Sequence, residues 1–177
     1  MSRVVVLLAM AAFVLPPTLR AQDGAPKVAA TAPACLPAAT LDQLSAALDD
    51  AVSGPGNKDR TCLRQLLTSD ARLTPIRKVQ DGGFETHVLT ADGWIDAVAK
   101  RGSTAFYERQ VKVRTEQYGH FAHLWSTYEI RDTPDGKATV TGINSIQAVF
   151  DGARWRVFSI LWEPDTTAGP VPEKYLP

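Results

Sequence analysis

The segment from residue 106 to residue 163 constrains the fold most, because it contains strand-forming stretches and turns but no helical pattern. Its stretches are rich in β-branched and aromatic residues, and the dipeptides Asp135-Gly136 and Asp151-Gly152 are typical of hairpin turns. Strands joined by such short turns pair antiparallel, so we expect a four-stranded meander. Its strands are predicted at residues 106–117, 118–132, 137–150 and 154–163.

Helices are predicted before this meander. Leu41, Leu44 and Leu48 recur at helical spacing, and Thr40 with Gln43 fits a capping box, which predicts a helix over residues 41–52. Two further helices are predicted at 59–68 and 92–101, with a hairpin of strands 71–79 and 84–89 between them. The predicted class is α+β, with about three N-terminal helices packed on one face of a curved, mainly antiparallel sheet.

Both faces of the predicted meander are apolar, so both should be covered. The helices cover one face, and we expect a homodimer through the other; the alternative cover is the Pro-rich C-terminal tail, residues 165–177. Regular alternation divides the apolar residues of the last strand into two sets, with Trp155, Val157 and Leu161 on one face and Phe158, Ile160 and Trp162 on the other.

The first 39 residues are predicted to lie outside the folded domain. Arg3, an apolar run from Val4 to Leu15 and the break at Pro16-Pro17 predict a signal peptide over residues 1–21. The apolar run is too short for a stable membrane span, although an uncleaved anchor is the alternative. Residues 22–39 are rich in Ala and Pro and predict a flexible leader. We therefore expect an exported protein, periplasmic or secreted, with no stable span after cleavage.

Charge and cysteine content indicate which partners and which covalent bond to expect. The chain has 19 basic and 19 acidic residues without a basic run, so we expect no nucleic-acid partner. Cys35 and Cys62 are the only cysteines, and in an exported chain such a pair favours a disulfide. The alternative is two buried free thiols. The three histidines lack ligand spacing, so we expect no metal. The sequence has no phosphate loop and no Rossmann glycine motif, so we expect no cofactor.

Four short stretches carry a resemblance to a known family. They are SDARL at 69–73, GHFAHLWSTYE at 119–129, GINSIQ at 142–147 and DGARW at 151–155. With the element order, they resemble the nuclear transport factor 2-like (NTF2-like) superfamily, most nearly its bacterial SnoaL-like and DUF4440-like members. The resemblance spans about residues 40–163, and the predicted domain is residues 40–164.

The resemblance implies a cone, in which the sheet wraps around the helices and leaves a cavity open at one end. It also implies dimers through the outer sheet face. It implies no activity, because this fold hosts isomerases, dehydratases, cyclases, binding proteins and interaction modules. Ketosteroid isomerases carry a tyrosine on their first helix and this chain has none there, so that activity is not carried over.

Candidate ligand-binding residues come from strand alternation. His120, Ser126 and Tyr128 share the parity of Ala122 and Leu124, which is predicted to face the cone. Asn144 lies on the more apolar face of its strand, where a buried amide needs hydrogen-bond partners. It is therefore either a structural clamp or a residue of the pocket wall.

Three functions are compatible with the sequence. The favoured one is binding of a small, largely apolar molecule in the cone by Asn144, His120, Ser126 and Tyr128. The second is a cofactor-free acid–base enzyme of isomerase or dehydratase type, with His120 or a strand-end glutamate, Glu129 or Glu163, as base. The third is a protein-interaction module. A pocket carboxylate with a shifted pKa favours the enzyme, and a cone filled by side chains favours the interaction module.

Overall fold

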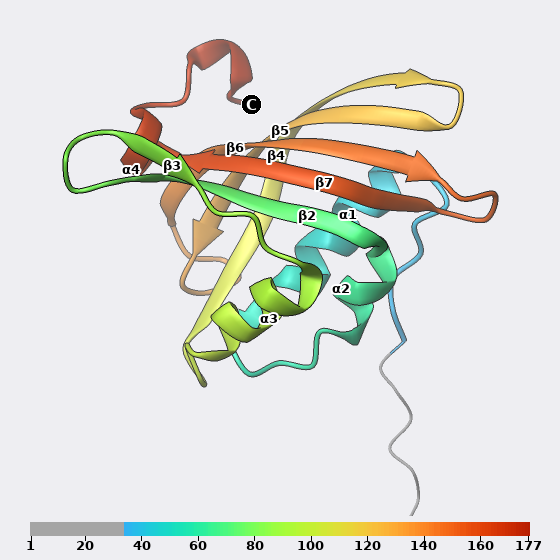
Figure 1. The fold of residues 1–177 in the computed structure, drawn as a ribbon, viewed down its shortest axis with the longest axis horizontal. Coiled ribbons are helices and arrows are strands. Elements are labelled where there is room, and N and C mark those ends of the chain that lie inside the picture. Colours follow the sequence, from blue (N-terminus) through green and yellow to red (C-terminus); the bar gives the residue numbers. More distant parts are fainter. Residues whose placement is uncertain (1–33) are drawn as a thin grey trace, which may run out of the picture. The chain divides into compact units, whose positions relative to one another are not determined.

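The computed structural model describes residues 34–177; the predicted signal peptide and most of the predicted leader lie outside this range. The described chain is α+β, as predicted, and its arrangement is shown in Figure 1. Its helices are α1 (Leu41–Val52), α2 (Thr61–Leu66), α3 (Ala91–Ala99), α4 (Asp165–Ala168) and a 3₁₀ turn, η1 (Glu173–Tyr175). Its strands are β1 (Gly54–Pro55), β2 (Leu67–Lys78), β3 (Phe84–Thr86), β4 (Ala105–Tyr118), β5 (Phe121–Arg131), β6 (Ala138–Phe150) and β7 (Trp155–Pro164).

One seven-stranded sheet organises residues 34–177, in the order β1-β4-β5-β6-β7-β2-β3. The predicted antiparallel meander is confirmed as β4 to β7. Strand β2 pairs parallel with β7, which places the predicted β2–β3 hairpin at one edge of the sheet. Helices α1, α2 and α3 all lie on one face, whereas the chain after β7 lies on the other (Figure 1).

The first helix begins and packs as its sequence predicts. The hydroxyl of Thr40 accepts a hydrogen bond from the Gln43 amide, and the Gln43 side chain accepts one from the Ala39 amide. The apolar stripe of α1 enters the core through Leu44, Ala47, Leu48 and Ala51. Helix α2 is shorter than predicted, because Leu67 already has an extended backbone and pairs with Val157 of β7.

Arg60 organises the loop between α1 and α2, and sequence reasoning missed this role. Its side chain is 1% exposed. The guanidinium donates hydrogen bonds to the carbonyl oxygens of Val52, Pro55, Gly56 and Lys58. It also lies 5.6 Å from the centre of the Trp94 ring on α3. Arg60 thereby fixes the loop to α3.

A β-bulge changes which side chains of β7 face the helices. Ala148 pairs with Val157, but the preceding residue, Gln147, pairs with Ser159, so Phe158 is an extra residue on β7. One extra residue exchanges the two faces of the strand beyond it. Ile160 and Trp162 therefore pack against the core with Trp155 and Val157, while Leu161 is 40% exposed. The predicted grouping, with Leu161 beside Val157, is wrong for this reason.

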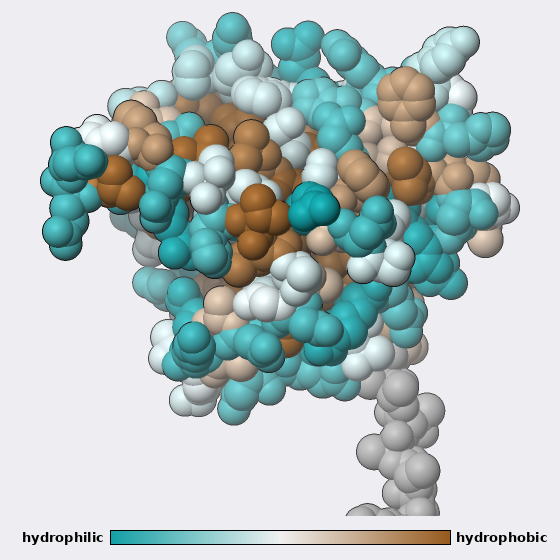
Figure 2. Space-filling model, viewed as in Figure 1, coloured by the Kyte–Doolittle hydropathy of each residue, from teal (hydrophilic) through white to brown (hydrophobic). Residues whose placement is uncertain are grey.

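The C-terminal tail folds over part of the outer sheet face. The Tyr175 ring lies 5.8 Å from the Trp125 ring of β5, and the Tyr175 carbonyl accepts a hydrogen bond from Thr127. Lys112 of β4 donates to the carbonyl of Leu176. The tail is therefore a cover for this face, as in the alternative prediction, and the homodimer stays a prediction. Figure 2 shows apolar side chains gathered in the middle of the visible surface, over β2 and β7.

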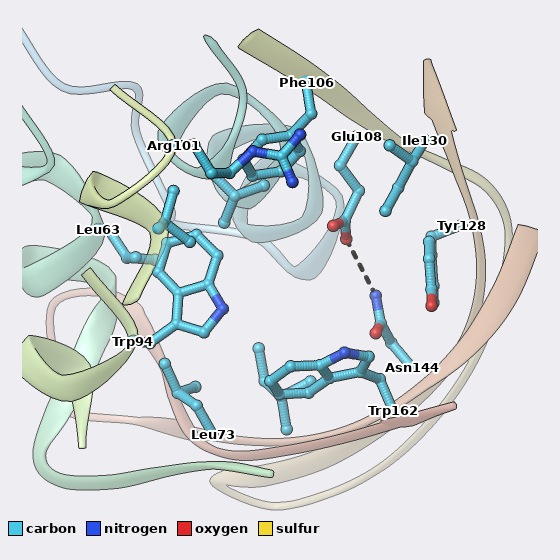
Figure 3. A pocket seen from close by; sticks show the side chains of 13 residues that line it. Leu63, Leu73, Trp94, Arg101, Phe106, Glu108, Tyr128, Ile130, Asn144 and Trp162 are labelled. Atoms are coloured by element: carbon cyan, nitrogen blue, oxygen red, sulfur yellow. Dashed lines mark hydrogen bonds between the residues drawn. The ribbon is translucent and has the colours of Figure 1, made fainter. Parts of the chain in front are cut away.

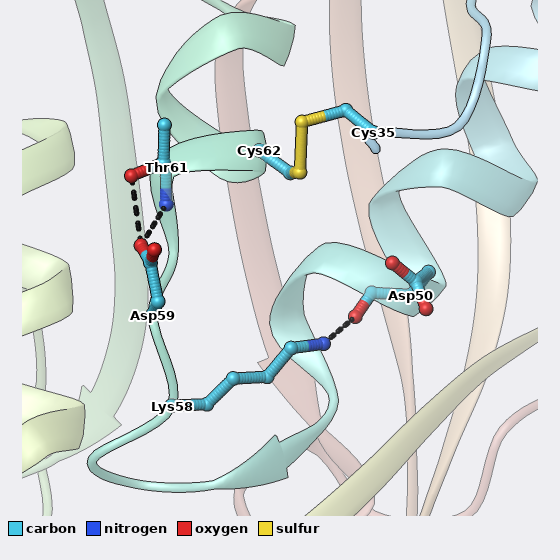
Figure 4. Close-up of a disulfide and its surroundings, with 6 residues drawn as sticks. All are labelled: Cys35, Asp50, Lys58, Asp59, Thr61 and Cys62. Carbon is cyan, nitrogen blue, oxygen red and sulfur yellow. Dashed lines mark hydrogen bonds between the residues drawn. A yellow bond between two sulfur atoms is a disulfide. The ribbon is translucent and has the colours of Figure 1, made fainter. Parts of the chain in front are cut away.

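The predicted disulfide is present. Cys35 and Cys62 are bonded, with their Cα atoms 5.3 Å apart, and the bridge joins the segment before α1 to α2 (Figure 4). Beside it, the Lys58 ammonium donates to the Asp50 carbonyl, and the Asp59 carboxylate caps the Thr61 amide. Within residues 34–177 no helix is long and apolar enough to cross a membrane.

Candidate functional site

A cavity of about 230 Å³ lies between the inner sheet face and the helices (Figure 3). Its polar side chains are Glu108, Tyr128 and Asn144, with Arg101 beside Phe106. The cone is therefore not filled by its own side chains. The apolar lining consists of Val52, Leu63, Leu73, Trp94, Val98, Phe106, Ile130, Ile160 and Trp162.

Glu108 enters this cavity from β4. The end of α1 fixes its backbone, because the Ser53 hydroxyl accepts from the Glu108 amide at 2.9 Å and donates to the Glu108 carbonyl. Glu108 was not predicted from the sequence, because the candidate carboxylates lay at strand ends. The available signal was alternation, which places Glu108 on the same face of the strand as Phe106, a buried residue.

Two amides hold one oxygen of the Glu108 carboxylate. Its Oε1 accepts hydrogen bonds from Asn144 Nδ2 at 3.2 Å and from Gln110 Nε2 at 3.0 Å. The Gln110 side-chain oxygen in turn accepts from the Ser126 hydroxyl. In the part of the chain that the structure describes, no hydrogen bond reaches Oε2 of Glu108, so this oxygen is available to a molecule in the cavity.

A second carboxylate lies behind Glu108. Asp49 of α1 accepts hydrogen bonds from the Gln110 backbone amide, at 3.0 and 3.2 Å to its two oxygens. Burial raises the pKa of Asp49 to about 6. The pKa of Glu108 rises to about 7, first because the carboxylate is buried and second because Asp49 is negatively charged. Near neutral pH, Glu108 therefore exists in both protonated and deprotonated forms.

Tyr128 lies near Glu108 in the cavity wall and is 2% exposed. Burial, followed by the charge of Glu108, raises the pKa of its phenol further above the ordinary value. The phenol therefore stays neutral at physiological pH and is a permanent hydrogen-bond donor. Gly142 makes room for this ring, because a Cβ atom at position 142 would lie 2.5 Å from both Cζ and Oη of Tyr128.

Replacing Gly142 with alanine should therefore displace the Tyr128 ring. The added Cβ would also lie 2.6 Å from the Glu163 carbonyl oxygen, which belongs to the paired strand and has little freedom to move. We expect a loss of about 1–3 kcal/mol in the free energy of unfolding, measured with urea. In the double variant Gly142→Ala/Tyr128→Ala, part of this loss should return. Equal losses with and without the Tyr128 ring would contradict the steric explanation.

The structure brings together two of the four predicted site residues at the cavity. Asn144 is 6% exposed and lines it with Tyr128, while Ser126 is buried behind them and joins the network through its hydrogen bond to Gln110. His120 was expected to point into the cone, and this expectation is wrong. It lies exposed in the turn between β4 and β5 and stacks on Phe150 at 6.4 Å. The binding roles of Asn144, Tyr128 and Ser126 remain predictions.

Among the described residues, no group of three or more His, Cys, Asp or Glu side chains could hold a metal ion. The polar end of the cavity instead combines a carboxylate with amide and phenol donors. This set of groups suits proton transfer and hydrogen bonding.

Comparison with solved structures identifies the fold. An NTF2-like protein of unknown function from Silicibacter pomeroyi is 17% identical, with 70% of this chain and 92% of that chain covered and a TM-score of 0.50. The Kfla4162 protein from Kribbella flavida is 13% identical, with 70% and 87% covered and a TM-score of 0.50. No family model and no curated protein matches the chain.

The described domain thus has the NTF2-like fold, as the sequence resemblance implied. At these identities the likeness concerns the fold alone, so function has to be argued from the cavity.

Proposed function

We propose that this protein binds a small, largely apolar molecule in the cone and transfers a proton with Glu108, without a cofactor. The observation that supports this most is a carboxylate in a largely apolar cavity, with its pKa raised to about 7 and with one oxygen that accepts no hydrogen bond from residues 34–177. A base whose pKa lies near the working pH combines a useful deprotonated fraction with a strong drive to accept the proton.

The neighbouring groups suit a substrate with an acidic C–H bond beside a carbonyl group. Oε2 of Glu108 would take the carbon-bound proton, while the Tyr128 hydroxyl would donate a hydrogen bond to the carbonyl oxygen as negative charge develops there. Return of the proton to another carbon gives an isomerase, and departure of a β-hydroxyl as water gives a dehydratase. The cavity is smaller than the roughly 300–1,000 Å³ typical of drug-sized ligands, so the substrate is small.

The test uses 5-nitrobenzisoxazole, a small apolar probe whose ring opens when a base removes its C3 proton. The N–O bond breaks as the nitrile forms, and the phenolate that is released absorbs visible light. We expect catalysed opening with a pH–rate profile that rises through an inflection near 7, as for Glu108. Glu108→Gln should lower the rate about a hundredfold, because the general base is lost.

Asp49→Asn is the matched second variant. It removes the negative charge that helps to raise the pKa of Glu108, while the asparagine oxygen can still accept from the Gln110 amide. The inflection should therefore move to lower pH with the activity retained. Binding of the probe without ring opening would indicate a ligand-binding protein instead. No binding and no opening would contradict the proposed site.

We further propose that this reaction takes place outside the cytoplasm, in the periplasm or after secretion. The disulfide supports this, because such bonds persist mainly in oxidising compartments. The predicted signal peptide is consistent with it. Cell fractionation of the producing organism, with detection of the cleaved chain by mass spectrometry, tests the localisation.

A further inference from the structure

A second cavity lies on the opposite side of the sheet, beneath the C-terminal tail. Its volume is about 440 Å³. Its floor is the outer face of the sheet, where Trp125, Ser145 and Leu161 are paired across three neighbouring strands. Its roof is the stretch from Asp165 to Tyr175. Glu108, Tyr128 and Asn144 do not line this cavity, although the two cavities share Trp162.

The tail is built to arch over the sheet. It is attached to β7 at one end, and at the other the Tyr175 carbonyl accepts from Thr127 while the Tyr175 ring contacts Trp125. Between these points, Pro170 and Pro172 restrict the backbone and contribute no N–H groups. A stiff, anchored segment of this kind holds the space beneath it open.

The charged side chains that line this space are negative. Glu163 and Asp165 line it, and no lysine, arginine or histidine is among its lining residues in the described chain. Trp125 and Tyr175 provide aromatic surface. Aromatic rings and carboxylates together attract cations, because both present negative potential. The ammonium of Lys174, 4.8 Å from the centre of the Tyr175 ring, already shows such a contact outside the cavity.

Two polar atoms of these lining residues lack a partner. Oδ1 of Asp165 and Nε1 of Trp125 are buried and form no hydrogen bond within residues 34–177. Ser145 does not serve them, since its hydroxyl is bonded to His123 at 3.0 Å. Leaving a buried acceptor and a buried donor unpaired is unfavourable. The unpaired Asp165 oxygen adds to the negative potential beside the cavity.

We propose that this outer cavity binds a small protonated amine with an apolar body. Its ammonium group donates to Asp165, and its apolar part packs between Trp125 and the prolines of the tail. The unpaired acceptor favours an amine that carries N–H bonds over a quaternary ammonium. Glu108 does not line this cavity, so the proposed amine site does not depend on the proposed reaction.

Benzylamine is the first probe, with benzyl alcohol as its neutral counterpart. In ¹⁵N–¹H spectra of the full chain, we expect benzylamine to shift the Trp125 indole signal, assigned with Trp125→Phe. The signal of Trp94, which lines only the inner cavity, should stay in place. Calorimetry should give about millimolar or tighter affinity for benzylamine and about tenfold weaker binding of benzyl alcohol.

Variants distinguish Asp165 from the carboxylate of the inner cavity. Asp165→Asn should weaken benzylamine binding about tenfold, whereas Glu108→Gln and the exposed control Asp132→Asn should leave it unchanged. Equal affinities for the amine and the alcohol would overturn the proposal. So would a shift of Trp94 instead of Trp125, or loss of binding in Glu108→Gln alone, since either would place the amine in the inner cavity. No binding of either probe would overturn it as well.

Discussion

Replacing Glu108 with glutamine should make the protein more stable at about pH 8, by up to about 3 kcal/mol in the free energy of unfolding. The carboxylate has a pKa of about 7 in the folded chain, against 4.5 as its ordinary value. The folded state therefore binds the proton more tightly than the unfolded state does. This figure is an upper value, because Glu108 is partly accessible through the cavity.

The sign of the pH dependence follows from the same shift. Below pH 4.5 the carboxylate is protonated in both states and carries no penalty. As the pH rises from 4.5 to 7, the unfolded state ionises first, so the folded state loses stability relative to it. Glutamine keeps an oxygen for Asn144 and Gln110 and does not ionise. Glu108→Gln should thus match the wild type at low pH and exceed it increasingly above pH 5.

Urea unfolding at several pH values measures this difference. The matched control is Glu116→Gln, which removes the same charge from an exposed position on the same strand. It should leave the pH dependence nearly unchanged. A constant difference between Glu108→Gln and wild type across this range would contradict burial of an ionisable group. The difference in the free energy of unfolding should instead rise with pH. If the same variant also loses ring opening, Glu108 serves the reaction and lowers the stability of the protein.

The fold could be predicted where local signals determine it. The β4–β7 meander follows from strand-forming stretches and turn dipeptides, and α1 from its cap and leucine spacing. The end of α2 could not be predicted, because Leu67 leaves the helix to pair with Val157, which is distant in the sequence. The β7 bulge at Phe158 was missed for a similar reason, since it is visible only in the pairing with β6.

The site was predictable only in part. Alternation placed Asn144 and Tyr128 correctly on the inner face, because both lie well inside regular strands. The same rule failed for His120, because the strand has already ended there: Tyr118 pairs with Phe121, and Gly119 has a φ of 55° in the turn between them. Glu108 was missed because its environment depends on the end of α1, which only the folded chain brings to β4.

Removing the disulfide should cost about 3.5 kcal/mol in the free energy of unfolding. The bridge closes a loop between residues separated by 27 positions, and in the chain-entropy model this restricts the unfolded chain by about that amount. The bridge also holds the segment before α1, where the carbonyl of Ala38 accepts a hydrogen bond from the Trp155 amide at 2.8 Å. In Cys35→Ala/Cys62→Ala, this amide should exchange its hydrogen faster.

Two measurements separate these effects. Urea unfolding of the double variant and of reduced wild type should give similar losses, because both lack the same bond. Hydrogen exchange at Trp155 reports the local segment, whereas the amide of Ile146 in the core serves as the internal reference for global opening. If Trp155 exchanges only as fast as Ile146, the bridge acts through the unfolded chain alone. If the loss of stability is below about 1 kcal/mol, the loop-closure explanation is wrong, and the bridge serves only to fix residues 35–39 against β7.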